Sequence, residues 1–180
     1  MIIMIIIQKI KTNMIIGNGN IAKVLIDRDD LVYFASGTSN SSCVDKLEFE
    51  RELEMIKSID SSLHIVYFSN LGIYYKNDPY TNHKINIENF IRDKFKSYTI
   101  VRIEVCEWVS NKTTILNIFK EKIKNNQKIE IQDTYRYVLS LNEFLYWLSL
   151  IKVGTKNEMN ILGRKMKIQE IVDEIKLGKL

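Results

Sequence analysis

The sequence predicts an α/β protein built on a parallel β-sheet, and three observations predict it. Short apolar runs alternate along the chain with stretches whose apolar residues have helical spacing. A glycine-rich turn, from Gly17 to Ala22, follows the first apolar run. Polar residues follow two later runs, at Ser36 and Ser69. Because ligands of open α/β sheets bind beyond the carboxyl ends of the strands, this pattern predicts a binding crevice there.

The composition suits one domain over residues 1–180. The chain is 46% hydrophobic, which is enough for a real core, and nothing in it suggests a linker. The net charge of +4 comes from basic residues scattered among acids, unlike the basic stripe of a nucleic-acid binder, so no nucleic-acid partner is expected. Residues 1–13 precede the first motif, and the sequence leaves them open as an edge strand, an extension or a start-codon artefact.

Cysteine usage and the first residues predict a soluble cytoplasmic protein. Cys43 and Cys106 stand in different segments without further ligands, which favours reduced thiols and no metal site. The apolar stretch from Met1 to Ile7 is too short to span a bilayer, so no membrane association is expected.

The alternation of strands and helices continues to the end of the chain. Strands are expected at residues 14–16, 31–35, 63–68, 98–103, 128–131, 137–139 and 159–162. Helices are expected at residues 21–26, 44–59, 79–95, 113–124, 142–151 and 168–177, with Gly178 as the last stop. In the helix at 44–59, Phe49, Leu53 and Ile56 predict the buried face, and the charges between them predict a solvated one.

The pattern Gly17-x-Gly19-x-x-Ala22 fits the phosphate-binding turn of a Rossmann-like dinucleotide fold. Glycines allow a tight turn and a close approach of the backbone, and the first amides of the next helix would bind a pyrophosphate. A plain tight turn without a ligand is the alternative. The charged residues 27–30 follow at once, and then the strand at 31–35, so the usual second strand has no room. These charges are more simply a solvated turn, which leaves NAD and NADP equally open.

Tyr80 and Lys84 provide a candidate proton-transfer pair. Four residues apart on a helix, they share one face, and an ammonium favours the phenolate of a nearby tyrosine. Asp78 can cap this helix and Pro79 suits its first position, which puts Tyr80 in the first turn. A surface helix pair is the alternative. Ser69 and Asn70 end the strand before this helix and would face the same crevice.

The order of four motifs resembles that of the extended short-chain dehydrogenase/reductase superfamily, and within it the NAD-dependent epimerase/dehydratase family. These motifs are the glycine turn, Phe34-Ala35-Ser36-Gly37, Tyr67-Phe68-Ser69-Asn70 and Tyr80-x-x-x-Lys84. Four segments, namely residues 16–23, 34–41, 48–52 and 80–88, resemble more narrowly a short-form branch of that family found among bacterial surface-polysaccharide genes. The resemblance covers nearly the whole chain from Met14.

The resemblance implies a truncated Rossmann-like sheet lacking its second and third strands, with residues 130–180 as a small substrate-side part. It implies NAD or NADP as cofactor, a nucleotide-linked sugar as substrate, Tyr80 as the proton carrier and Lys84 as its partner and a ligand of the nicotinamide ribose. The family's hydroxyl position falls on Asn70, with Ser69 as the alternative, and Arg136 matches a substrate-binding arginine. The cofactor-binding positions that it implies are Gly17, Gly19, Asn20, Ile21, Ala35, Ser36, Gly37 and Lys84. Because Asn70 lacks a hydroxyl, a catalytically degenerate nucleotide- or nucleotide-sugar-binding relative is the alternative.

Other chemically capable residues are weighed against simpler interpretations. His83 is expected on the surface, and Cys106 in the core or a loop rather than as a nucleophile. Arg102 is equally a diphosphate ligand or a structural ion-pair partner. The aromatic residues around Trp147 suggest core burial, with a homodimer contact as the alternative.

Overall fold

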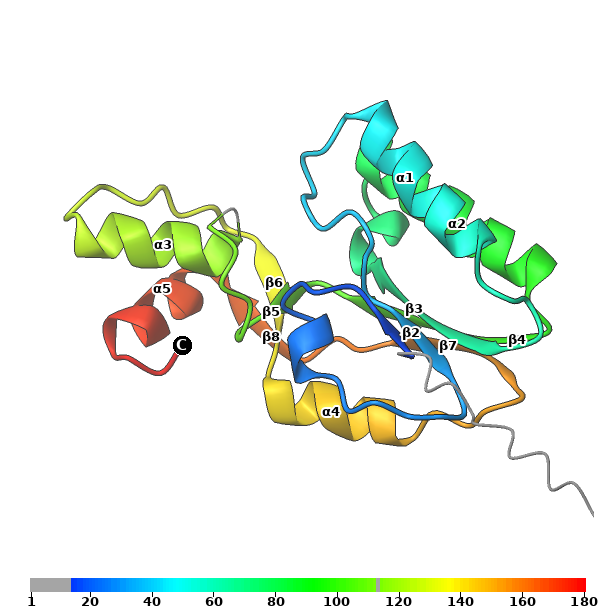
Figure 1. The fold of residues 1–180 in the computed structure, drawn as a ribbon. Coiled ribbons are helices and arrows are strands. Elements are labelled where there is room, and N and C mark those ends of the chain that lie inside the picture. Colours follow the sequence, from blue (N-terminus) through cyan, green and yellow to red (C-terminus); the bar gives the residue numbers. More distant parts are fainter. Residues whose placement is uncertain (1–13, 113) are drawn as a thin grey trace, which may run out of the picture.

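The computed structural model describes residues 14–112 and 114–180. The leading residues 1–13 lie outside the described residues. The described chain forms two β-sheets with helices packed around them (Figure 1). None of the helices in these two ranges is long and apolar enough to cross a membrane.

The larger sheet has five strands, all parallel. In spatial order they are β1 (Ile15–Ile16), β2 (Val32–Phe34), β3 (His64–Asn70), β4 (Ser97–Ile103) and β7 (Lys156–Asn160). Only residues 17–31 separate β1 from β2, and these two strands pair directly. The parallel sheet confirms the predicted α/β class, and the direct pairing agrees with the predicted truncation.

Helices cover both faces of this sheet, which explains why its central strands are continuous apolar runs. α1 (Lys46–Lys57) and α2 (Pro79–Lys94) lie on one face, and α4 (Leu141–Ser149) lies on the other (Figure 1). Successive residues of β3 alternate between the two cores: Ile65 and Tyr67 pack with α1 and α2, whereas Val66 and Phe68 pack with α4.

A second sheet of three strands lies beyond the carboxyl ends of the strands of the first sheet. β5 (Val105–Cys106) pairs with β6 (Tyr135–Leu139), which pairs on its other side with β8 (Arg164–Lys167) in the antiparallel sense. α3 (Ile115–Lys124) and α5 (Ile168–Lys176) pack together beside it (Figure 1). Gly178 follows α5 with a φ of 68°, as expected for a helix stop.

Two sequence expectations for the elements are wrong, and two strands were not expected. The helix after the glycine turn is a single 3₁₀ turn, η1 (Ala22–Val24), because Leu25 is already extended and the chain must reach β2 within a few residues. Residues 128–131 form no strand: both sides of β6 are taken, and Ile129 packs on the α3–α5 core instead. Conversely, β5 and β8 were not expected, because β5 has only two residues and β8 is largely polar.

Candidate active site

A cavity of about 430 Å³ lies beyond the carboxyl ends of β2, β3 and β4 and extends to the second sheet. Its volume falls within the usual range of ligand pockets. The structure brings most of the predicted site residues to its wall, namely Gly19, Asn20, Ile21, Ala35, Gly37, Ser69, Asn70, Tyr80, Lys84 and Arg136. Gly17 and Ser36 do not line it.

The glycine turn is built differently from the dinucleotide pattern that predicted it. Gly17 has a φ of 129°, and a Cβ there would lie 2.5 Å from the carbonyl oxygen of Ala35, so this glycine lets the turn pack on the end of β2. Gly19 lines the cavity, and a Cβ on it would meet nothing within 4 Å. The helix that was expected to bind a pyrophosphate with its first amides is only the short turn η1, and pyrophosphate binding at this turn stays a prediction.

Ser36 is engaged on the far side of the loop from the cavity. Its carbonyl oxygen accepts a hydrogen bond from Arg51 Nη2 at 3.2 Å, and its hydroxyl lies against the sulfur of Met55. The charged residues 27–30 do not line the cavity either, and Arg28 pairs with Asp30 at 2.7 Å.

Tyr80 reaches the cavity from the first turn of α2. As predicted, Asp78 caps this helix: its carboxylate accepts a hydrogen bond from the Thr81 amide at 2.8 Å, and Pro79 holds the first position. Tyr80 is 6% exposed, and the Lys84 Nζ lies 5.6 Å from the centroid of its ring, so the two side chains share one face. Burial raises the pKa of Tyr80 above its usual value, although the Lys84 ammonium acts in the opposite direction. The expectation of a lowered pKa is therefore wrong for the free protein, because burial outweighs the neighbouring charge.

Lys84 belongs to a buried ion pair that the sequence analysis missed. Its Nζ donates to Glu52 Oε1 at 2.9 Å and to the Tyr67 hydroxyl at 3.0 Å, and the Tyr67 hydroxyl donates to Glu52 Oε1 at 2.8 Å. Glu52 has no exposed surface, whereas the sequence predicts a solvated face for the charges of α1. The available signal was its position, three residues after Phe49 and four before Ile56, which puts it on the buried stripe.

His83 is also buried, so its predicted surface position is wrong. Its ring stacks on Phe49 with centroids 4.3 Å apart, and its Nε2 lies 3.0 Å from Glu52 Oε2. Burial alone would raise the pKa of Glu52, but the Lys84 ammonium and the hydrogen bond from His83 outweigh it and hold that pKa below its usual range. Glu52 is therefore ionised at neutral pH.

The two polar residues that end β3 differ in their hydrogen bonding. Asn70 Oδ1 accepts from the Gly72 amide at 2.7 Å and so caps the 3₁₀ helix η2 (Leu71–Tyr74). The Ser69 hydroxyl is buried and has no hydrogen-bond partner among the described residues. The Thr38 hydroxyl, which the sequence analysis did not single out, is likewise buried and unpartnered within the described ranges, and Thr38 also lines the cavity.

Arg136 lies at the other end of the cavity, on β6. Its Nε is 3.8 Å from Glu104 Oε1, the same oxygen to which the Tyr75 hydroxyl donates at 2.8 Å. Burial and this hydrogen bond raise the pKa of Tyr75. Lys76 lines the cavity beside them. Two cations, Arg136 and Lys76, therefore line this end of the cavity, and Glu104 is the one carboxylate among the described residues of the cavity wall.

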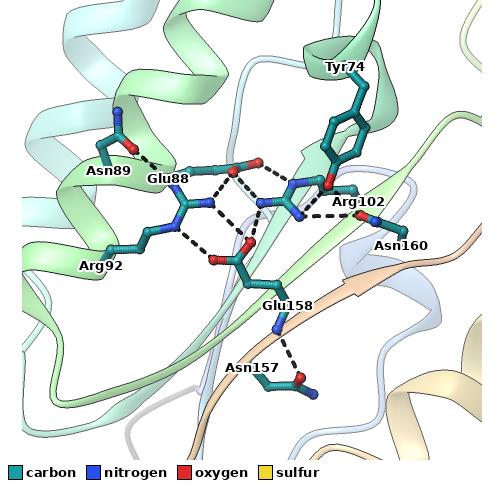
Figure 2. A network of polar contacts seen from close by, with 8 residues as sticks. All are labelled: Tyr74, Glu88, Asn89, Arg92, Arg102, Asn157, Glu158 and Asn160. Carbon is teal, nitrogen blue, oxygen red and sulfur yellow. Dashed lines mark hydrogen bonds and ion pairs between the residues drawn. The ribbon is translucent and has the colours of Figure 1, made fainter.

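Arg102 is a structural ion-pair partner rather than a diphosphate ligand, the two roles that the sequence left open. It is 3% exposed, it does not line the cavity, and its guanidinium binds Glu88 at 2.8 Å and Glu158 at 2.6 Å (Figure 2). Hydrogen bonds from Arg92 and Arg102 lower the pKa of Glu158 to about 2, although its burial acts against them.

Cys106 is buried, as expected, and burial raises the pKa of its thiol to about 12, which disfavours a nucleophilic role.

Comparison with solved structures identifies the fold. At 14% identity and a TM-score of 0.62, 83% of the chain matches 56% of the Bordetella bronchiseptica enzyme WbmG in complex with NAD and UDP. At 15% identity and a TM-score of 0.61, 83% matches 62% of dTDP-4-dehydrorhamnose reductase from Bacillus anthracis in complex with NADP. The capsular polysaccharide assembling protein CapF from Staphylococcus aureus matches at 17% identity and a TM-score of 0.55. The chain has the Rossmann-like fold of these proteins.

The chain spans about half the length of these solved structures, between 45 and 62%. No protein-family model and no curated protein matches the sequence. The likeness to these structures therefore shows the fold alone.

Proposed function

We propose that the chain binds NAD or NADP together with a nucleotide-linked sugar in this cavity, and that Tyr80 transfers a proton at the sugar carbon where a hydride is exchanged. One observation carries the proposal: Tyr80, Lys84 and the unpartnered Ser69 hydroxyl lie around one cavity that also borders the glycine turn. Solved structures of the same fold, with NAD and UDP or with NADP bound, support this ligand class.

The residues at the cavity wall fit such ligands. Gly19 leaves room for a ligand against the turn, and the buried Thr38 and Ser69 hydroxyls lack protein partners in the described part of the chain. Lys84 can donate to a ribose hydroxyl, and Arg136 can hold a diphosphate, because a planar guanidinium matches phosphate oxygens. The nicotinamide, when bound, supplies or accepts the hydride.

The protonation state of Tyr80 gives the proposed reaction a direction. Burial raises the pKa of its phenol, so Tyr80 carries its proton at neutral pH in the free protein. A protonated phenol can donate to a developing alkoxide, which suits reduction of a keto sugar. Ser69 would donate a second hydrogen bond to the same oxygen and stabilise its charge.

A catalytically degenerate nucleotide- or nucleotide-sugar-binding protein is the second candidate, and two observations favour it. Asn70, which occupies the family's hydroxyl position, uses its side-chain oxygen to cap η2. The Lys84 ammonium is already paired with Glu52. Such a protein would keep the cavity and bind nucleotide without turnover.

Cofactor binding is tested by thermal unfolding in the presence of NAD and of NADP. A ligand that binds only the folded state adds about 2.7 kcal/mol of stability at a concentration 100 times its dissociation constant. We expect one of the two dinucleotides to raise the midpoint of unfolding. If neither raises it, binding of NAD or NADP is excluded for both candidate functions.

Catalysis is tested by following cofactor absorbance with a panel of nucleotide sugars. Wild type is expected to turn over one of them, and Tyr80→Phe is expected to bind the cofactor equally well while losing at least about 100-fold in turnover, because general acid catalysis contributes that much. Tyr146→Phe, on α4 and 60% exposed, is the matched control. Equal rates in wild type and Tyr80→Phe would show that Tyr80 does not transfer the proton. If neither protein turns over any sugar while the cofactor still binds, the degenerate alternative is favoured.

A further inference from the structure

Glu52 is a carboxylate without exposed surface, behind the cavity wall. Its Oε1 accepts from the Lys84 ammonium and the Tyr67 hydroxyl, and its Oε2 accepts from the Thr38 amide at 2.7 Å and lies within hydrogen-bond distance of His83 Nε2. These four contacts fill the acceptor sites of a carboxylate. Glu52 therefore has no capacity left for a ligand, and it does not line the cavity.

Lys84, in contrast, keeps one donor. An ammonium has three N–H groups, and those of Lys84 that have described partners bind Glu52 and Tyr67. The side chain is 2% exposed and lines the cavity, so the remaining N–H is available to a ligand there. Burying an ammonium is costly unless an opposite charge lies beside it. The Glu52 carboxylate, 2.9 Å away, supplies that counter-charge.

The turn after β2 is shaped around this ion pair. A Cβ on Gly37 would lie 2.7 Å from Glu52 Oε1 and 3.0 Å from Lys84 Nζ, so a larger residue would make one or both of these side chains shift. The next residue, Thr38, donates its amide to Glu52. Elements from three parts of the chain, the β2 turn, α1 and α2, therefore converge on one carboxylate.

We propose that Glu52 is a positioning residue of the candidate site, which keeps the Lys84 ammonium charged and turned so that its third N–H faces a hydroxyl of the bound ligand. What that N–H binds rests on the proposed function. The charge and the position of Lys84 do not rest on that function, and both can be measured without any ligand.

The experiment measures how the acylation of Lys84 by trace acetic anhydride depends on pH, with the modified peptide quantified by mass spectrometry. Only the neutral amine reacts, so the profile reports the charge of Lys84. We expect Glu52→Gln to move this profile down by about one pH unit or more, since an adjacent opposite charge stabilises a charged group by that much. Glu54→Gln, an exposed acid on the same helix, should leave it unchanged. An unchanged profile in folded Glu52→Gln, with folding checked by circular dichroism, would overturn the proposal.

A second pair of variants keeps the test decisive if Glu52→Gln does not fold. Gly37→Ala crowds the Glu52 carboxylate and the Lys84 ammonium and should move the profile in the same direction, whereas Gly19→Ala, which meets nothing within 4 Å, should not. An unmoved profile in Gly37→Ala would also reject the role of Glu52.

Ligand binding then separates this proposal from the function on which it partly rests. NAD or NADP, whichever stabilises wild type, should protect Lys84 from acylation, and Glu52→Gln should lose more of the cofactor-induced thermal shift than Glu54→Gln. A stabilising cofactor that leaves Lys84 unprotected would reject the third N–H as its ligand. If neither cofactor stabilises wild type, the dinucleotide function fails, while the acylation profiles still decide whether Glu52 holds the charge of Lys84.

Discussion

At the end of β3, two neighbouring residues have different roles that their sequence positions do not reveal. Asn70 occupies the position of the expected hydroxyl, but its side-chain oxygen caps η2. The Ser69 hydroxyl is buried beside the cavity without a partner among the described residues. Leaving a hydroxyl unsatisfied costs roughly 1–3 kcal/mol, so Ser69 contributes little to folding and is free to bind a ligand. This favours Ser69 over Asn70 as the donor to a reacting oxygen.

Replacing Ser69 with alanine should therefore separate stability from activity. We expect Ser69→Ala to unfold at the same denaturant concentration as wild type or a higher one, because it removes an unsatisfied buried hydroxyl. Turnover should fall on the order of 100-fold, the usual effect of losing a donor to a developing oxyanion. Urea unfolding and cofactor absorbance measure the two quantities. A large loss of stability would mean that the hydroxyl has a structural partner.

At the scale of the element, α2 presents a polar stripe to the interior. Tyr80, Lys84 and Glu88 stand four residues apart, and all three are buried. Tyr80 faces the cavity, Lys84 pairs with Glu52, and Glu88 pairs with Arg102 of β4, which also binds Glu158 of the edge strand β7 (Figure 2). The charge of Lys84 thus ties α2 to α1, and the charge of Glu88 ties it to the sheet.

Removing the charge of Glu88 should loosen this attachment. Glu88→Gln leaves the buried Arg102 with only Glu158, and breaking a buried ion pair by changing one partner costs about 3–5 kcal/mol. Glu54→Gln, which breaks an exposed pair with Lys57, should cost less than about 1 kcal/mol. The free energy of unfolding in urea measures both. Equal small losses would mean that the network in Figure 2 adds no stability.

At the scale of the whole molecule, the cavity exists because the chain crosses between two sheets. β4 leads into β5, and β7 leads into β8, so both crossings leave the larger sheet for the smaller one. The second crossing passes through Gly163, whose φ is 68° and whose Cα packs on the backbone of Val138 in β6. Only glycine fits there, since a Cβ would overlap that backbone.

Gly163→Ala should therefore destabilise the molecule more than an alanine at a comparable glycine. Gly154 also has a positive φ, 82°, but a Cβ on it would meet nothing within 4 Å. Gly154→Ala should cost about 1 kcal/mol from backbone strain alone, and Gly163→Ala should cost more, because the overlap with Val138 adds to the same strain. Thermal and urea unfolding compare the two. An equal loss in both would show that the smaller sheet can shift to make room.

Much of this arrangement could be predicted from the sequence, because its signals are local. The apolar runs of β2, β3 and β4, the glycine turn, and the Asp78 cap with Pro79 each depend on residues close together in the chain. Tyr80 and Lys84 share a face for the same reason. Failures came where the outcome depends on partners: η1 replaces a helix because β2 follows so soon, and residues 128–131 have no strand to pair with.

The sequence by itself determined the α/β class, the truncated parallel sheet and the face that joins Tyr80 to Lys84, because periodicity and capping act over a few residues. Only the tertiary structure decided which charges are buried. Glu52 and His83 resemble surface residues in the sequence, and Glu52 meets His83 and Lys84 only when α1 packs beside α2. A charge is stable in the interior only beside a partner, and the fold alone determines which partner that is.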